Sequence, residues 1–297
     1  MAYRAFVVGA NYGLKYAVDD AQRIARSLQK LGYELWESCF TSAEEGNHAL
    51  IASFKSFAAT CAPEDTMLFY FAGHGIVYKG LLYFVLENYN TNQNPLKTCL
   101  SLNDISSAFQ ASDASNKLMI LDCCHAGNAF RLADFDFSDN YLVITASESF
   151  EKALEIEDHK AGILSHYLYN ALTKDLAKVA KNSKVKLNAL LHYLRYRVTE
   201  HNKASPDKVP QITVVSKQKY DMVVAVFDNP FLSLCGLVCV NSAFLSTERD
   251  KTGSHYTPEN FYGALPPVQW WGVTNGLVAE QSMYGAVVQH VHQAIQA

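Results

Sequence analysis

Two short motifs carry the side chains best suited to nucleophilic chemistry. FAGHG (71–75) places a histidine, His74, between two glycines, and LDCCHAG (121–127) places Cys123 and Cys124 side by side. A thiol becomes a good nucleophile at neutral pH when a base or an imidazolium lies close to it. These residue types therefore predict a thiol–imidazole unit, provided that the fold brings His74 to one of the cysteines.

The adjacent cysteines alone leave four interpretations open. A disulfide between neighbours would require a strained ring. A metal site would require further ligands at suitable spacing, and the sequence contains no C-x-x-C. Two small buried residues at a strand end are the ordinary alternative, because free cysteine is among the most buried residue types. The histidine of the first motif favours the fourth interpretation, a catalytic nucleophile.

The segments around both motifs alternate between apolar runs and helical spacing. Nearly continuous apolar runs predict buried strands, and apolar residues at i, i+3 and i+4 predict helices between them. We expect strands at 3–9, 33–40, 66–72, 117–123, 140–146 and 211–215, and helices at 16–31, 43–61, 103–111, 162–176 and 186–201. This alternation predicts an α/β sandwich with a mostly parallel central sheet.

Both motifs follow apolar runs that end just before their reactive side chains. In parallel sheets, ligand sites lie at the carboxyl ends of the strands, so neighbouring strands would bring His74 and Cys124 to one edge. Gly75 adds a backbone N–H that no side chain hinders. Together with the N–H of Cys124, it is predicted to form an oxyanion hole for a tetrahedral intermediate.

The two motifs together resemble those of the caspase-like cysteine peptidases, in particular metacaspases and orthocaspases. These carry Tyr/Phe-x-Gly-His-Gly and Asp-x-Cys-His-Ser/Ala-Gly, whereas the Gln-Ala-Cys-x-Gly of animal caspases is absent from this sequence. The resemblance runs over residues 3–218 and implies a caspase-like αβα sandwich. It also implies that Cys124, which precedes the histidine, is the nucleophile, that Cys123 fills a variable position, and that His74 is the base.

The resemblance extends to acidic residues that line a substrate pocket. LKYAVDDA (14–21) resembles a family segment whose last aspartate falls on Asp20, and this residue and Asp122 would line the pocket for the residue before the cleaved bond. Two carboxylates in such a pocket favour Arg or Lys through charge-assisted hydrogen bonds. The stretch ITASESFEKALE (144–155) resembles the family's substrate-lining strand, which implies a substrate contact at Ser147.

Three departures from the family pattern affect these expectations. Ala72 stands where the family often has a pocket serine, and Tyr16 and Ala17 replace a glycine and a cysteine. The segment 102–105, which would match a calcium-binding acidic run, holds one carboxylate, too few for a site of six to eight oxygens. We therefore expect no calcium requirement, and no other metal or cofactor.

Composition narrows the partners and the location. A net charge of −4 and a pI of about 6.2 do not suggest nucleic acid or an anionic membrane as partner. The sequence shows no apolar signal core and no apolar span of membrane length, so a cytoplasmic protein with free thiols is expected. A peptidase domain is predicted at 1–228 and an extension of unknown role at 229–297; nothing predicts the oligomeric state.

The sequence thus predicts a cysteine endopeptidase that cleaves protein or peptide substrates after Arg or Lys. Exposed basic residues after the nucleophile, namely Arg131, Lys152 and Lys160, suggest self-processing. One alternative is a catalytically silent scaffold or signalling adaptor that acts through protein contacts. Another is a peptidase of different specificity, in which Asp20 faces away from the pocket.

Overall fold

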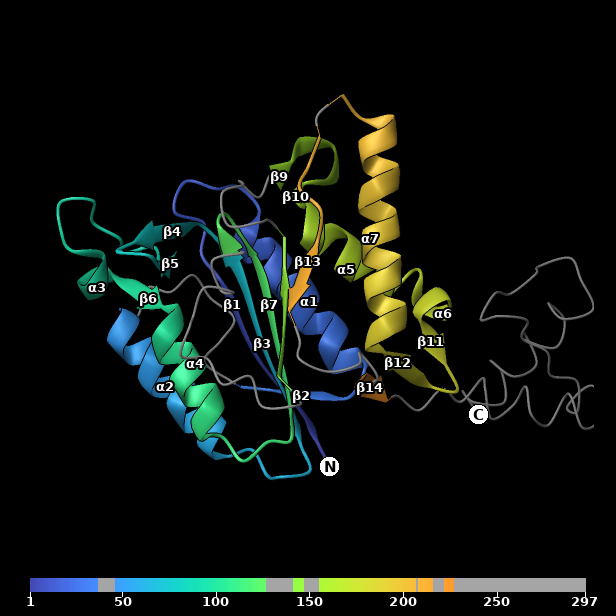
Figure 1. Cartoon of the computed structure of the whole chain (residues 1–297), viewed down its shortest axis with the longest axis horizontal. Coiled ribbons are helices and arrows are strands. Elements are labelled where there is room, and N and C mark those ends of the chain that lie inside the picture. The colour runs from blue at the N-terminus through green and yellow to red at the C-terminus, as the bar shows by residue number, and fades with distance from the viewer. Residues whose placement is uncertain (37–45, 127–140, 147–154, 207, 216–221, 227–297) are drawn as a thin grey trace, which may run out of the picture. The chain divides into compact units, whose positions relative to one another are not determined.

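A six-stranded sheet forms the centre of the fold in this computed structural model, which describes residues 1–36, 46–126, 141–146, 155–206, 208–215 and 222–226 (Figure 1). The strand order is β13-β8-β7-β3-β1-β2. All neighbouring pairs are parallel except β13 with β8. The strands are β1 (Tyr3–Gly9), β2 (Tyr33–Leu35), β3 (Thr66–Gly73), β7 (Asn116–Cys123), β8 (Tyr141–Thr145) and β13 (Thr213–Val215). The predicted α/β fold with a mostly parallel sheet is confirmed.

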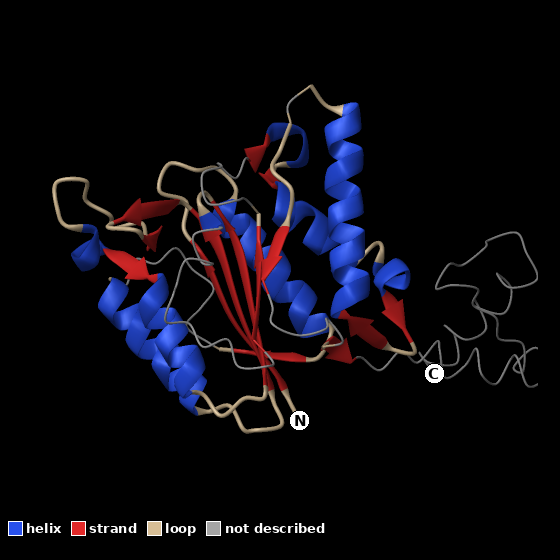
Figure 2. Ribbon diagram, viewed as in Figure 1, coloured by secondary structure: helices blue, strands red, loops and turns tan. Residues whose placement is uncertain are grey.

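Helices cover both faces of this sheet (Figures 1 and 2). One layer holds α1 (Ala17–Lys30), α5 (Ile163–Leu172) and α7 (Leu187–Ala204), and the other holds α2 (Asn47–Ala59) and α4 (Leu102–Ala111). Because both faces of β3 are covered, all of its residues are buried, which explains its unbroken apolar sequence. Phe69 and Phe71 pack into an aromatic core on one side, and Tyr70 on the other side contacts Ser165 of α5.

The main elements lie where the sequence predicts them, and their ends differ in physically clear ways. The predicted helix 162–176 ends at Leu172, where Asp175 donates its N–H back to the Asn170 carbonyl over 2.7 Å. The chain then forms the short helix α6 (Leu176–Val179). Helix α1 ends near Gly32, whose φ of 83° lies in the left-handed region that glycine favours at a helix end.

Several short elements were not predicted, because strands of two to five residues carry little periodicity. The one most relevant to the site is a small antiparallel sheet of β4, β5 and β6, which begins directly after His74. A hairpin of β9 and β10, with the 3-10 helix η2 between its strands, precedes α5. The bounds of these smaller elements are β4 (Gly75–Tyr78), β5 (Leu81–Val85), α3 (Pro95–Thr98), β6 (Cys99–Ser101), β9 (Glu155–Ile156), η2 (Glu157–His159), β10 (Ala161–Gly162), β11 (Ala180–Lys181), β12 (Lys184–Lys186) and β14 (Val223–Val226).

Contacts divide the chain into one unit of Met1–Val226 and a second of Phe227–Ala297. The predicted extension at 229–297 lies outside the described residues, so its boundary and role stay predictions. Within the described ranges, no helix combines the length and apolarity needed to cross a membrane.

Candidate active site

The register of β3 and β7 brings the two motifs together. These strands are parallel neighbours in which Gly73 lies opposite Cys123, so His74 and Cys124 each follow the last paired residue of their strand. The prediction that both side chains reach the same sheet edge is confirmed at the level of the backbone. Cys124 and His74 are both half-buried, which suits groups that must meet a substrate.

Backbone packing behind the two side chains requires glycine at position 75. A Cβ on Gly75 would lie 2.2 Å from the Cys124 carbonyl oxygen, closer than real atoms approach. After Cys124 the chain turns sharply through His125, whose φ of 57° is left-handed. Histidine is among the non-glycine residues enriched in that conformation, and such strain concentrates at functional sites.

The backbone pairing of β4 also bears on the predicted oxyanion hole. Val85 donates its N–H to the His74 carbonyl over 2.9 Å, which makes these two a hydrogen-bonded pair of the antiparallel ladder. Gly75 and Phe84 form the next pair, and in an antiparallel ladder that pair is not hydrogen-bonded. The Gly75 N–H is therefore directed away from β5 and remains a candidate donor to an oxyanion, together with the N–H of Cys124.

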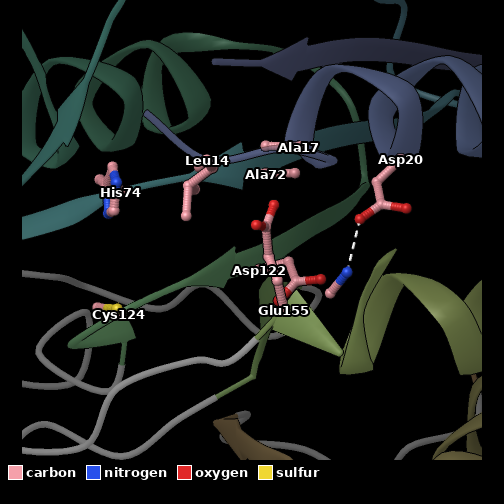
Figure 3. A pocket seen from close by; sticks show the side chains of 10 residues that line it. Leu14, Ala17, Asp20, Ala72, His74, Asp122, Cys124 and Glu155 are labelled. Carbon is pink, nitrogen blue, oxygen red and sulfur yellow. Dashed lines mark hydrogen bonds between the residues drawn. The ribbon is translucent and has the colours of Figure 1, made fainter. Parts of the chain in front are cut away.

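A cavity of about 60 Å³ connects the reactive pair to the predicted acidic residues (Figure 3). In the close-up view, His74 and Cys124 lie toward one end and Asp20 toward the other, with Asp122 and Glu155 between them. The cavity is lined by Leu14, Ala17, Asp20, Ala72, Gly73, His74, Asp122, Cys124, Glu155 and Gly162. Ala72 occupies part of the cavity wall and offers no hydroxyl there.

Asp122 is held at the start of α5. Its Oδ2 accepts the backbone N–H of Ser165 over 2.9 Å and also the Ser165 hydroxyl. The positive end of the helix dipole favours a carboxylate at this place. Burial nevertheless raises the pKa of Asp122, because the side chain is only 6% exposed and the Ser165 hydrogen bonds offset the loss of water incompletely.

Asp20 reaches the same helix start from α1. Its Oδ2 accepts the backbone N–H of Gly162 over 2.7 Å, which Figure 3 marks as a dashed line. With 3% exposure, burial raises the pKa of Asp20 to about 8, against the lowering effect of the Gly162 hydrogen bond. The charge of Asp122 raises it further, whereas Arg23, 3.7 Å from Asp20 Oδ1, opposes the rise.

Glu155 is a cavity residue that the sequence did not single out, although it ends the quoted stretch 144–155. Its Oε1 and Oε2 accept the backbone N–H groups of Tyr16 (2.8 Å) and Lys15 (3.0 Å). Its charge raises the pKa of Asp20, Asp122 and His74. A glutamate on a two-residue strand in a polar segment looks in sequence like a solvated surface residue, so no local signal indicated this role.

The imidazole of His74 is influenced by the loop between β1 and α1. Burial lowers the pKa of His74, while the charge of Glu155 and a backbone hydrogen bond with Tyr12 raise it. The Tyr12 ring also meets the imidazole edge to face, at 6.4 Å between centroids. Tyr12 was not predicted, because a backbone group leaves no mark on residue type.

The two adjacent cysteines have different surroundings. Cys123 is 0% exposed, and burial raises the pKa of its thiol well above the usual range. Cys124 is half-buried and lines the cavity. Only Cys124 therefore combines access to a ligand with a position opposite His74.

Two further sequence predictions concern Ser147 and metal ions. Ser147 lies outside the described residues, so its role stays a prediction. Among the residues that the structure describes, no three or more His, Cys, Asp or Glu side chains are grouped to hold a metal ion. The expectation of no calcium requirement stays a prediction as well.

Comparisons with known proteins identify the class to which this fold and site belong. The model of the caspase domain family matches residues 2–221, so the chain belongs to this family of cysteine peptidases. Its structure is similar to that of a protein from Geobacter sulfurreducens (TM-score 0.53, 13% identity, 77% of this chain and 100% of that chain covered). It is also similar to caspase-1 from Spodoptera frugiperda (TM-score 0.52, 12% identity, 77% and 90% covered). The search of curated proteins found no match.

Proposed function

We propose that this chain is a cysteine endopeptidase of the metacaspase or orthocaspase type that cleaves after Arg or Lys. The supporting observation is the convergence of three carboxylates, those of Asp20, Asp122 and Glu155, on the cavity that His74 and Cys124 also line. Asp20 and Asp122 are buried carboxylates with raised pKa values, and such groups gain most from a cation that enters beside them. An aspartate side chain would instead be repelled there.

The chemistry begins with proton transfer from the Cys124 thiol to His74. The sulfur then forms a bond to the scissile carbonyl carbon, and the backbone N–H groups of Gly75 and Cys124 donate to the oxyanion. When the tetrahedral intermediate collapses, the C–N bond breaks and His74 gives its proton to the leaving amine. A water molecule, deprotonated by His74, attacks the thioester, releases the carboxylic acid and restores the thiol.

The choice of Cys124 over Cys123 rests on access and ionisation. Thiolate is the reactive form, and burial that raises the pKa of a thiol keeps it protonated. Cys123 is fully buried with a raised pKa, whereas Cys124 reaches the cavity. His125 directly follows Cys124, and the base in this proposal is His74 from the neighbouring strand.

Covalent labelling tests both the nucleophile and the pocket. A peptidyl chloromethyl ketone ending in arginine should alkylate Cys124, as fragment mass spectra of wild type, Cys123→Ala and Cys124→Ala will show. The matched reagent ending in aspartate should label far more slowly. Labelling of Cys123, or faster labelling by the aspartate reagent, would contradict the assignment. A folded protein that neither reacts nor hydrolyses peptides would favour the alternative of a silent scaffold.

A further inference from the structure

The loop between β1 and α1 contacts both halves of the candidate active site. The Tyr12 ring in this loop meets the His74 imidazole edge to face at 6.4 Å between centroids, and Leu14 lines the cavity. Lys15 and Tyr16 then lead into α1, the helix that carries Asp20. A shift of this one loop would therefore move the partner of the base and one wall of the pocket.

The loop has a conformation that its sequence does not favour. Leu14 donates its N–H to the Asn11 carbonyl over 2.7 Å, and the two residues between them have positive φ values, 35° for Tyr12 and 87° for Gly13. A turn with positive φ at both central residues is of type I′, which favours Asn-Gly at its centre. Tyrosine with positive φ is strained, so contacts from outside the turn must hold it.

Glu87, two residues beyond β5, supplies such contacts at the His74 end of the loop. Its Oε1 accepts two backbone N–H groups, from Asn11 over 2.6 Å and from Tyr12 over 3.1 Å. Val85, at the end of the same strand, donates to the His74 carbonyl. The backbone of the base and the loop that orients its ring are thus fixed by one strand end.

Glu155 supplies the matching contacts at the pocket end, but in a different manner. Its two carboxylate oxygens are both used, one for the Tyr16 N–H and the other for the Lys15 N–H. Glu155 is 139 residues from Tyr16 in sequence, so the contact ties α1 to the β9–β10 hairpin. The loop is therefore held by one carboxylate at each end.

We propose that Glu87 and Glu155 are positioning residues that hold the β1–α1 loop in place, Glu87 for the base and Glu155 for the pocket. Glu87 fixes Tyr12, whose ring lies edge to face against the His74 imidazole. Glu155 fixes the segment that carries Leu14 and the start of α1. The kinetic consequences of this inference rest on the proposed peptidase function, whereas the effect of Glu87 on His74 rests on the contacts that Tyr12 makes with both residues.

Replacement by glutamine should affect Glu87 and Glu155 differently. Glu87 uses one oxygen for both N–H groups, so Glu87→Gln retains the acceptor, whereas Glu87→Ala removes it. Glu155 uses both oxygens, so in Glu155→Gln an NH2 group faces one of the two backbone N–H groups and cannot accept from it. Glu155→Gln should therefore restore little of the function that Glu155→Ala loses. Glu157→Gln is a matched control, because Glu157 contacts the same loop through the Lys15 ammonium and the Tyr16 hydroxyl, yet is well exposed.

Kinetics with an arginine peptide test whether Glu87 acts on the base and Glu155 on the pocket. Glu87→Ala should lower kcat by about 10- to 100-fold with little change in KM, because a misplaced base loses rate. Glu87→Gln should stay within about threefold of wild type. Glu155→Ala and Glu155→Gln should both raise KM for arginine peptides more than they lower kcat, and Glu157→Gln should match wild type. Equal losses in Glu87→Ala and Glu87→Gln, or wild-type kinetics in Glu87→Ala and Glu155→Ala, would overturn the proposal.

Histidine NMR tests the Glu87 contact without any turnover. The His74 signal is assigned with His74→Gln, and its titration is followed in each variant. Glu87→Ala should lower the pKa of His74 and speed hydrogen exchange at the Tyr12 amide, whereas Glu87→Gln should do neither. The charge of Glu155 also raises the pKa of His74, and Cys124 lines the same cavity as His74. The titration in Glu87→Ala is therefore compared with that in Glu87→Gln, and the titrations in the Glu155 variants are compared with that in Glu157→Gln. If the His74 titration and the Tyr12 amide exchange are both unchanged in Glu87→Ala, the positioning role of Glu87 is refuted. This outcome is decisive even if wild type cleaves no basic peptide.

Discussion

Replacing Asp20 with asparagine should weaken cleavage after arginine by a factor that grows with pH. The substitution keeps the size of the side chain and an oxygen for the Gly162 N–H, but removes the charge. Because burial raises the pKa of Asp20 to about 8, the wild-type carboxyl is ionised in about a tenth of the molecules at pH 7. At pH 9 most molecules carry the charge, which the variant never gains.

The size of the effect follows from two free energies. Losing one partner of a buried charge pair costs about 2 to 5 kcal/mol, which is about 30- to 4,000-fold in kcat/KM. At pH 7 the wild type must first remove the proton from Asp20, which costs about 1.4 kcal/mol and reduces its advantage over the variant about tenfold. We therefore expect wild type to exceed Asp20→Asn by about 3- to 400-fold at pH 7 and by the full factor near pH 9.

The same substitution should stabilise the fold at high pH. A carboxyl with a raised folded-state pKa binds its proton more tightly when folded, so the free energy of unfolding falls as pH rises between the unfolded and folded pKa values. For Asp20 this window runs from the ordinary pKa of 3.8 to about 8. The slope reaches at most about 1.4 kcal/mol per pH unit, and Asp20→Asn should lack it in thermal unfolding.

The assay measures kcat/KM on one fluorogenic arginine peptide between about pH 6 and pH 9. The ratio of wild type to variant cancels the titrations of groups that both proteins share. Asp19→Asn, the same change at the exposed neighbouring position of α1, is the control and should give a ratio near one at every pH. A ratio for Asp20→Asn that stays near one, or that falls with rising pH, would refute the reasoning.

Three further predictions concern the nucleophile, metal dependence and self-processing. Cys124→Ala should abolish peptide cleavage and Cys123→Ala should keep most of it, as rates on one peptide will measure; the reverse pattern in folded proteins would assign the wrong sulfur. EGTA should leave kcat/KM unchanged, because the segment 102–105 holds one carboxylate; a loss of about tenfold or more that calcium restores would contradict this. Wild type should cut itself after one or more of Arg131, Lys152 and Lys160 while Cys124→Ala stays intact; intact-mass spectra decide this, and an uncut active wild type would remove the claim.

The parts of the fold that the sequence predicted are those with long apolar patterns. β3 and β7 are buried on both faces, so their sequences are nearly unbroken apolar runs, and the residues that follow them, His74 and Cys124, could be placed at one sheet edge. Asp20 was predicted through family resemblance, and the structure places it in the cavity.

The contacts that the sequence did not predict run through the backbone. Glu87 and Glu155 accept N–H groups from residues more than 70 positions away, and the backbone of Tyr12 raises the pKa of His74. Backbone groups are the same in every non-proline residue, so such partners leave no trace in residue type or spacing. They become visible only when the strand register and the loop conformation are known.

Hydrolysis of a peptide panel that differs only at the residue before the cleaved bond tests the proposed peptidase and its pocket together. Purified wild type should cleave after Arg and Lys with kcat/KM at least about a hundredfold above that for Asp or Leu, and Cys124→Ala should cleave none of the peptides. Preferred hydrolysis after Asp or an aliphatic residue would contradict the acidic pocket. Equal residual hydrolysis by wild type and Cys124→Ala would contradict the peptidase itself.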